Sequence, residues 1–309
     1  MSRVAFIMVA DGPRFEVPAM ILAGSIRHIH GRSVGIYAYC PEPKMAEFGP
    51  LFHEVMAHHD VTIAPIPDGR DLWQEPYPHG NKLLACAALR PEDHTVYLDT
   101  DMVMLSDVSD LWLGEIAHTG HVSVVPEGIP TWGRDDVDWQ PAYDLFGLPV
   151  PTTRVRMCRG KRRSTLPYFN AGFVSWLDEG TRFGQTWLDT AIEIDRCDAI
   201  ENKRPWLDQI ALPVAIARTG LDMHVAEQRF NFSLYRREFP VQAPMSIAHY
   251  HIPAVFRAEP ACKDMLETVI SDLPESLSGA LREDTLPFMM AIKRLRRAQK
   301  RQAMAIAAE

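Results

Sequence analysis

The stretch NKLLACAALRPEDHTVYLDTDMVML, from Asn81 to Leu105, decides which fold this sequence can adopt. Its pattern predicts a helix over 81–89, which stops before a proline, and then an apolar strand over 95–98. This strand runs directly into two carboxylates, Asp99 and Asp101. Because residues two apart in an extended chain point the same way, both side chains can face one ion.

Strands and helices alternate upstream of this stretch. Strand-type apolar runs and helix-type spacing follow one another over 4–10, 18–30, 33–39, 44–58 and 61–66. This alternation is typical of an α/β fold with a mostly parallel central sheet flanked by helices. Ligands of such sheets bind beyond the carboxyl ends of the strands, so we expect a site where these strands end.

The chain downstream contains a strand over 121–125 and then a long polar and aromatic excursion over 127–167. An excursion of this length in a compact domain is predicted to be functional, as an acceptor-binding segment or a lid. Further strands and helices follow over 173–176, 183–197, 207–217 and 246–251. We therefore expect one domain over 1–258, followed by a C-terminal helical extension over 259–309.

The composition is that of a folded globular protein, with 309 residues, 47% of them hydrophobic and 23% charged. A formal net charge of −8 argues against general nucleic-acid binding. The five cysteines show no CxxC spacing, which argues against a zinc site and fits a reducing compartment. We find no signal peptide and no apolar run long enough to span a bilayer, so we expect a cytoplasmic protein.

The longer segment from Tyr77 to Trp112, YPHGNKLLACAALRPEDHTVYLDTDMVMLSDVSDLW, resembles the core of the GT-A glycosyltransferases, especially glycosyltransferase family eight. The resemblance extends from Val4 to Arg257 and is strong in patches. It implies a Rossmann-like nucleotide-binding sheet and a UDP-sugar donor, such as UDP-glucose or UDP-galactose. It also implies transfer to a glycan, glycolipid or other hydroxyl acceptor, with retention of configuration.

This resemblance implies that Asp99, Thr100 and Asp101 hold Mn²⁺ or Mg²⁺ against the donor diphosphate. The residue types suit that chemistry, because hard divalent cations prefer oxygen ligands and phosphate oxygens can complete the shell. Breaking the bond from sugar to phosphate puts negative charge on the leaving diphosphate, which a bound cation stabilises. Such short matches also arise by chance, in which case the aspartates would be turn and capping residues.

The segment YFNAGF, from Tyr168 to Phe173, resembles a family motif that lines the donor-sugar pocket. The resemblance assigns Asn170 and Ala171 to this pocket. An asparagine side chain offers donors and an acceptor to sugar hydroxyls, and Gly172 permits a close backbone approach. The same residue types are also ordinary choices for a turn into the next strand.

The segment WLDQ, from Trp206 to Gln209, resembles a family motif that precedes a helix. The resemblance implies that Asp208 and Gln209 contact the sugar near its anomeric carbon, where they could steady an oxocarbenium-like centre. Together with Asn170 they are the candidate catalytic residues. Asp208 could also cap the helix that follows, and the two roles are compatible.

The segment SIAHYH, from Ser246 to His251, resembles the late strand whose histidine is the third protein ligand of the metal. His249 matches the family pattern, and His251 is the alternative because its spacing to the next basic residue fits better. That basic residue is Arg257, which could replace the lysine that contacts the phosphates in the family. Arginine can neutralise phosphate with two parallel hydrogen bonds.

Three further residues occupy positions where the family binds its donor. Lys82, at the head of its helix, could contact the donor sugar or phosphate, or could be a solvated surface lysine. Ala10 and Asp11 end the first strand, where the resemblance implies contacts with the nucleoside. An Asp-Gly pair is also a strong turn signal, so Asp11 could be a turn residue.

Two basic segments lie outside these motifs. Residues 154–163 could bind an anionic acceptor, such as a phosphorylated or acidic glycan, although charge runs more often form solvated loops. Residues 288–306 show apolar side chains at helical spacing, with basic residues on the remaining faces. Such a helix could lie on the inner face of an anionic membrane, or pack on the body or on a second subunit.

Two other functions are compatible with parts of this pattern. A sugar-phosphate nucleotidyltransferase would need a glycine-rich basic loop after the first strand, and VADGPRFEVP is a poor match. A non-catalytic nucleotide- or carbohydrate-binding protein could retain the same fold. The sequence has no GxxxxGK[ST], GxGxxG after a strand, HExxH or GxSxG motif, which removes the main support for kinase, dehydrogenase and hydrolase functions.

Overall fold

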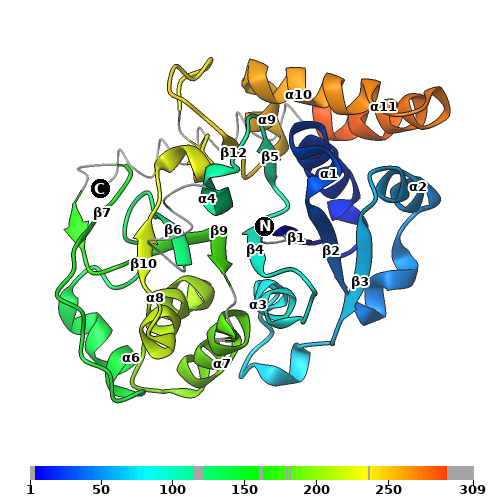
Figure 1. Ribbon diagram of the computed structural model, residues 1–309. Helices are drawn as coiled ribbons and strands as arrows, with labels where there is room; N and C mark the ends of the chain where they lie inside the picture. Colours follow the sequence, from blue (N-terminus) through cyan, green and yellow to red (C-terminus); the bar gives the residue numbers. More distant parts are fainter. Residues whose placement is uncertain are drawn as a thin grey trace.

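The computed structural model describes residues 4–113, 122–159, 163–177, 180, 182–235 and 237–290. These residues form one domain in which helices cover both faces of a central sheet (Figure 1). The predicted α/β class with a mostly parallel central sheet is confirmed.

The central sheet of the described residues has seven strands in the order β10-β6-β9-β4-β1-β2-β3. Neighbouring strands run parallel, except that β9 is antiparallel to both β4 and β6. The strands are β1 (Val4–Val9), β2 (Gly35–Pro41), β3 (Thr62–Ile66), β4 (His94–Leu98), β6 (Val122–Pro126), β9 (Phe169–Leu177) and β10 (Met223–Val225).

Strand β1 shows why a strand that is covered on both faces has a continuous apolar sequence. Phe6 and Met8 belong to the core beneath α1, whereas Ala5 and Ile7 belong to the core beneath α3. Because both faces are covered, neither set of side chains can be polar. The covering helices are α1 (Glu16–His30) and α2 (Pro50–His58) on one face, and α3 (Gly80–Ala87), α7 (Phe183–Arg196) and α8 (Leu207–Thr219) on the other.

A close contact between α3 and α7 fixes the helix that precedes β4. A Cβ atom on Gly184 would lie 2.0 Å from the carbonyl oxygen of Cys86, so only glycine allows this approach. The contact positions α3, which carries Lys82 toward the carboxyl end of β4.

A second, three-stranded sheet brings a late segment of the chain to the end of β4. It has the order β11-β12-β5, formed by β5 (Met102–Met104), β11 (Phe232–Ser233) and β12 (Ile247–His249). Strand β12 pairs antiparallel with β5, and the backbone N–H of Tyr250 donates to the carbonyl of Asp101 at 3.1 Å. This pairing places the histidines of the late strand beside the aspartate turn.

The excursion over 127–167 has secondary structure of its own. It contains a 3-10 helix (Asp136–Trp139), α6 (Gln140–Asp144) and a small hairpin of β7 (Val155–Arg156) and β8 (Ser164–Thr165). Trp139 is buried and packs edge-on against Trp132 and Tyr168. The described part of the excursion is therefore packed on the domain, and its role as an acceptor-binding segment or lid stays a prediction.

Two expected elements differ from the observed ones. The helix expected over 44–58 is divided into a 3-10 helix (Glu42–Glu47) and α2, because Pro50 restarts the helix at its first turn. The strand expected over 173–176 begins earlier, so Asn170 lies within β9 and not in a turn before it.

The chain continues after β12 into α9 (Pro253–Ala258), α10 (Pro260–Ser271) and α11 (Glu275–Met290), which lie beside α1 (Figure 1). Phe288 packs against Tyr250 and Phe256, and the rest of the predicted basic helix, from 291 on, lies outside the described residues. None of the helices described has both the length and the apolar character that a membrane span requires.

The remaining short helices of the described residues are α4 (Asp110–Leu113) and 3-10 turns at Pro13–Phe15, Gly31–Ser33, Arg70–Leu72 and Gln228–Asn231.

Candidate active site

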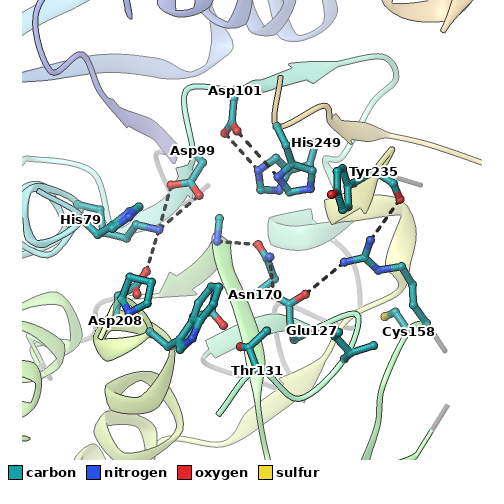
Figure 2. A pocket seen from close by; sticks show the side chains of 18 of the residues that line it. His79, Asp99, Asp101, Glu127, Thr131, Cys158, Asn170, Asp208, Tyr235 and His249 are labelled. Carbon is teal, nitrogen blue, oxygen red and sulfur yellow. Dashed lines mark hydrogen bonds and ion pairs between the residues drawn. The ribbon is translucent and has the colours of Figure 1, made fainter. Parts of the chain in front are cut away.

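A pocket of about 950 Å³ opens where β4 and β12 end (Figure 2). Its lining residues come mainly from α3, the turn after β4, the excursion over 127–167, β9, the start of α8, the segment after β11 and the end of β12. Segments far apart in sequence therefore meet here. The predicted site residues that line it are Lys82, Asp99, Asp101, Asn170, Asp208, Gln209, His249 and His251.

Lys82 is buried beside the pocket and contacts two carboxylates. Its Nζ lies 3.0 Å from Asp99 Oδ1 and 3.0 Å from Asp208 Oδ2, and it donates to the carbonyl of Ala171 at 3.2 Å. Burial alone would lower the pKa of Lys82, but the two carboxylates raise it above its usual value. Lys82 is therefore an internal cation paired with two carboxylates and not a solvated surface lysine.

Both carboxylates also accept a hydrogen bond from a tyrosine. Tyr97 Oη donates to Asp99 Oδ1 at 2.8 Å, and Tyr77 Oη donates to Asp208 Oδ1 at 2.8 Å. Burial would raise the pKa of Asp208, but Lys82 and Tyr77 lower it, so this buried carboxylate stays ionised. We call Lys82, Asp99 and Asp208 the lysine cluster.

A second cluster forms around Asp101. Its Oδ1 lies 3.2 Å from His249 Nε2 and its Oδ2 lies 4.0 Å from His251 Nδ1. The other ring nitrogens are also held, because His249 Nδ1 lies 3.0 Å from Asn231 Oδ1 and His251 Nε2 lies 2.9 Å from Ser233 Oγ. Each imidazole thus turns one nitrogen toward Asp101. We call Asp101, His249 and His251 the histidine cluster.

The histidine cluster differs from the lysine cluster in how it titrates. Burial would raise the pKa of Asp101, but His249 lowers it; burial would lower the pKa of His249, but Asp101 raises it. Burial and the neighbouring His249 together lower the pKa of His251 to about 3. Near neutral pH the imidazole of His251 is therefore neutral and able to bind a cation.

Gly172 lies where the two clusters meet. A Cβ atom on this residue would lie 2.8 Å from Asp99 Oδ2, 2.8 Å from Asn170 Oδ1 and 2.8 Å from His249 Cε1. Its carbonyl accepts from the backbone N–H of Asp99 at 2.8 Å. No side chain fits between these groups, so glycine is required for both clusters to approach one another.

A chain of hydrogen bonds links the excursion to the histidine cluster. Asn170 Nδ2 donates to Glu127 Oε2 at 2.7 Å, and Asn231 Nδ2 donates to Asn170 Oδ1 at 2.9 Å. The side-chain amide oxygen Oδ1 of Asn231 then holds the Nδ1 of His249, as described above. Asn170 is therefore fixed on both sides of its amide, with its orientation set before any ligand binds.

Comparison with known proteins decides the family. A family model described as a Rhodobacterales glycosyltransferase domain matches residues 6–220, well over half of the chain. The chain belongs to this glycosyltransferase family. The matched region contains the whole lysine cluster and Asn170, and it ends before His249.

Solved glycosyltransferase structures share the fold of this glycosyltransferase. The galactosyltransferase LgtC, solved with donor and acceptor sugar analogs, has a TM-score of 0.50 and 16% identity, covering 89% of this chain and 99% of that chain. Mouse xyloside xylosyltransferase 1 has a TM-score of 0.53 and 11% identity, and the match covers 80% of this chain and 97% of that chain. GlyE from Streptococcus pneumoniae has a TM-score of 0.53 and 13% identity, and the match covers 92% of this chain and 63% of that chain.

These identities show the fold alone, and the predicted GT-A fold is confirmed. A comparison of the sequence with curated proteins found no match.

The residues of the histidine cluster fit a divalent cation. One ligand atom from each of Asp101, His249 and His251 lies within 4.8 Å of the others. A set of one carboxylate and two imidazoles suits a borderline ion such as Mn²⁺. The hydrogen bonds to the outer ring nitrogens are those that usually orient metal-binding histidines. The structure brings both candidate histidines to Asp101, whereas Asp99 faces Lys82.

Gln209 lines the pocket with an unsatisfied side chain. Its Oε1 is buried and accepts no hydrogen bond from any part of the chain that the structure describes. A buried acceptor without a donor is destabilising, and a ligand hydroxyl would satisfy it. Asp208 does not cap α8, because the N-cap residue is Trp206 and the Asp208 carboxylate faces Lys82.

Three predicted donor-binding residues lie at the end of β1 or beside it, outside the lining of this pocket. The carboxylate of Asp11 accepts from Lys44 Nζ at 2.7 Å, directly after Ala10. The hydroxyl of Thr100 donates to the carbonyl of Val9 and so ties the aspartate turn to β1. These contacts place the end of β1 next to the turn that carries both aspartates.

Arg257 does not line the pocket. It lies on α9, and its guanidinium donates to the carbonyl of Met289 on α11. Two other arginines, Arg159 and Arg237, line the pocket instead. His251 has a φ of 58°, a left-handed conformation, where the chain leaves β12 for α9. A family spacing cannot anticipate such a turn.

Two residues that hold the site together, Glu127 and Asn231, belong to none of the predicted motifs. Glu127 directly follows β6, so the rule that ligands bind beyond strand ends could have indicated it. Asn231 ends a short 3-10 helix and belongs to no motif, so no sequence signal pointed to it.

Proposed function

We propose that this glycosyltransferase moves a hexose from UDP-glucose or UDP-galactose to an acceptor hydroxyl, with Mn²⁺ or Mg²⁺ as cofactor and with retention of configuration. One observation carries the proposal: the lysine cluster and the histidine cluster meet across Gly172 in a single pocket. The lysine cluster offers fixed charges that can stabilise a reacting sugar. The histidine cluster offers ligands for the cation that binds the donor diphosphate.

The histidine cluster would hold the cation. A divalent ion bound there would stabilise the negative charge that develops on the leaving diphosphate. Asp101, His249 and His251 supply the ligand atoms, and Asp99, whose Oδ2 approaches Gly172, is a further proposed ligand. Asn231 and Ser233 hold the outer nitrogens of the two imidazoles, so the ligand atoms need little reordering on binding.

Positive side chains and the end of β1 would bind the rest of the nucleotide. Arg159 and Arg237 line the pocket and would take the phosphate-binding role that the family resemblance implies for Arg257. Ala10 and Asp11 would meet the nucleoside at the end of β1, where Lys44 already orients the carboxylate of Asp11.

The hexose would lie between Asn170, Asp208 and Gln209. Lys82 and Tyr77 keep the Asp208 carboxylate ionised and fixed, so it can stabilise positive charge that develops at the anomeric carbon. The unsatisfied Oε1 of Gln209 would accept from a sugar hydroxyl. The acceptor hydroxyl attacks on the face that the phosphate leaves, and a leaving phosphate oxygen takes its proton, so no enzymic nucleophile is required.

A donor-hydrolysis screen tests this proposal without knowledge of the acceptor. We expect UDP release from one of the two UDP-hexoses, dependent on Mn²⁺ and abolished by chelation. The variant Asp101→Asn should lose this activity, and Asp107→Asn, an exposed aspartate outside the pocket, should retain it. Release of pyrophosphate would indicate a nucleotidyltransferase, and UDP binding without turnover would indicate a non-catalytic binding protein.

We also propose that the acceptor is a glycan, a glycolipid or another hydroxyl compound, handled in the cytoplasm. The basic segment 288–306 would contact an anionic membrane surface or a second subunit. Co-sedimentation of the full chain with anionic vesicles, lost at high salt and absent with neutral vesicles, is the result that favours a membrane.

A further inference from the structure

A second, smaller pocket adjoins the active pocket. Its volume is about 260 Å³, and its lining residues are Ile129, Pro130, Arg134, Met157, Arg159 and Arg163. Ile129 and Arg159 also line the active pocket, so one molecule can occupy both. Complete small-molecule sites usually measure roughly 300–1,000 Å³, so the smaller pocket suits one group of a ligand whose remainder lies in the larger one.

The smaller pocket is strongly basic. Of the six described residues that line it, three are arginines and none is acidic. Arg159 Nη2 lies 3.7 Å from Glu127 Oε1, so its charge is partly balanced. Arg134 and Arg163 are exposed, and neither forms an ion pair with any of the residues described. Like charges gathered around a concave surface raise the local concentration of anions.

An ordered backbone frame holds these arginines. The backbone N–H of Met157 donates to the carbonyl of Arg163 at 2.9 Å, and that of Arg159 donates to the carbonyl of Gly128 at 2.9 Å. A Cβ atom on Gly128 would lie 2.1 Å from Arg159 Nε, so this glycine lets the guanidinium lie against the peptide. Arg159 Nη1 also donates to the carbonyl of Tyr235 at 3.2 Å, which fixes it between the two pockets.

We infer that this smaller pocket, the arginine subsite, binds an anionic group of the acceptor, a phosphate or a carboxylate, while the acceptor hydroxyl reaches the donor in the active pocket. The inference rests on the proposed function. Guanidinium groups match the geometry of both anions through paired hydrogen bonds. The donor diphosphate is the competing occupant, but Arg134 and Arg163 do not line the active pocket, where the diphosphate would lie.

Calorimetric titration of the full chain, saturated with UDP and Mn²⁺, tests the inference. The probes are glucose 6-phosphate, glucose 1-phosphate, glucuronate and neutral glucose. We expect an anionic sugar to bind at least about tenfold more tightly than glucose, with the preference falling as salt is raised. The phosphate and carboxylate probes distinguish the two kinds of anion. Equal affinity for glucose and for all anionic probes would overturn the inference.

The double variant Arg134→Gln/Arg163→Gln tests whether the preference for anionic sugars arises at the arginine subsite. It should bind the preferred anionic sugar at least about tenfold more weakly than the wild type. Arg156→Gln, an exposed arginine of the same hairpin that lines neither pocket, is the matched control and should bind like the wild type. Unchanged binding in the double variant, or an equal loss of UDP affinity, would overturn the inference. A wild type that releases UDP from its donor but does not prefer anionic sugars would refute this inference alone.

Discussion

Asp99 and Asp101 are two residues apart on one turn, yet they belong to different clusters. The carboxylate of Asp99 contacts Lys82, a cation that is a permanent part of the chain. The carboxylate of Asp101 contacts His249 and His251, whose imidazole nitrogens can bind a metal ion. The difference shows that the partners of a carboxylate decide its role, whereas spacing decides only that the two aspartates lie close together.

The substitution Lys82→Met should cause the largest change in stability. It leaves the buried carboxylate of Asp208 and the partly exposed carboxylate of Asp99 without a cation, and breaking the buried pair of Lys82 and Asp208 costs about 3–5 kcal/mol of unfolding free energy. Urea denaturation measures the loss. The double variant Lys82→Met/Asp208→Asn should recover part of it, because one buried charge is removed. A single variant as stable as the wild type would show that the lysine cluster is not a buried ionic unit.

The substitution His251→Asn should weaken Mn²⁺ binding by roughly 100-fold, as expected when a direct ligand is lost. Asparagine tolerates the left-handed backbone at this position, so the change tests the imidazole and not the turn. The preference for Mn²⁺ over Mg²⁺ should also fall, because nitrogen ligands favour the transition metal. Calorimetry with both ions measures this, with exposed His53→Asn as the control. An unchanged ratio of affinities would exclude His251 as a ligand.

The substitution Asn231→Leu should weaken Mn²⁺ binding by about tenfold to 100-fold, because His249 loses the acceptor that orients its ring. Asn231→Asp retains an acceptor for His249 Nδ1 and should lose much less. Titration of Mn²⁺ into each variant, with unfolding curves to confirm the fold, provides the measurement. Equal losses in the two variants would show that orientation of His249 is not what Asn231 supplies.

The two clusters should also differ in their response to pH. Asp101 raises the pKa of His249, so below that pKa a metal ion must displace a proton. Mn²⁺ affinity should therefore rise with pH, by up to about tenfold per unit, and level off above the pKa of His249. The lysine cluster should contribute no slope near neutral pH, because the pKa of Lys82 is raised and that of Asp208 is lowered. Calorimetry in buffers of different ionisation enthalpy, at a pH where the affinity still rises with pH, should count about one proton released per metal; a count of zero at that pH would contradict this.

Much of the fold was predictable from local pattern. Strand β1 is a continuous apolar run and β4 ends in one, and each is followed by a polar turn. The antiparallel direction of β9 was not predictable, because the buried face of a strand reads the same in either direction. The start of β9 was also missed, since Asn170 and Gly172 are turn-type residues that here serve the pocket.

The candidate site was predictable as a set of residues and not as a set of contacts. Motifs identified Lys82, Asp208 and His249, because each stands at the head of a helix or the end of a strand. Which carboxylate Lys82 would neutralise depends on the tight packing of α3 against α7 at Gly184, which no spacing reveals. The position of Arg257 depends on the turn at His251, which directs the following helix toward α11.

Mn²⁺ titration of Asp101→Asn and Asp99→Asn, in the presence of UDP, tests the division between the two clusters most directly. Asp101→Asn should lose more than about 100-fold in Mn²⁺ affinity, because it removes the central ligand of the histidine cluster. The loss of Mn²⁺ affinity in Asp99→Asn should be smaller than that in Asp101→Asn by a factor of at least roughly ten, because Lys82 and Tyr97 already engage the carboxylate of Asp99. An equal or larger loss from Asp99→Asn would contradict the account.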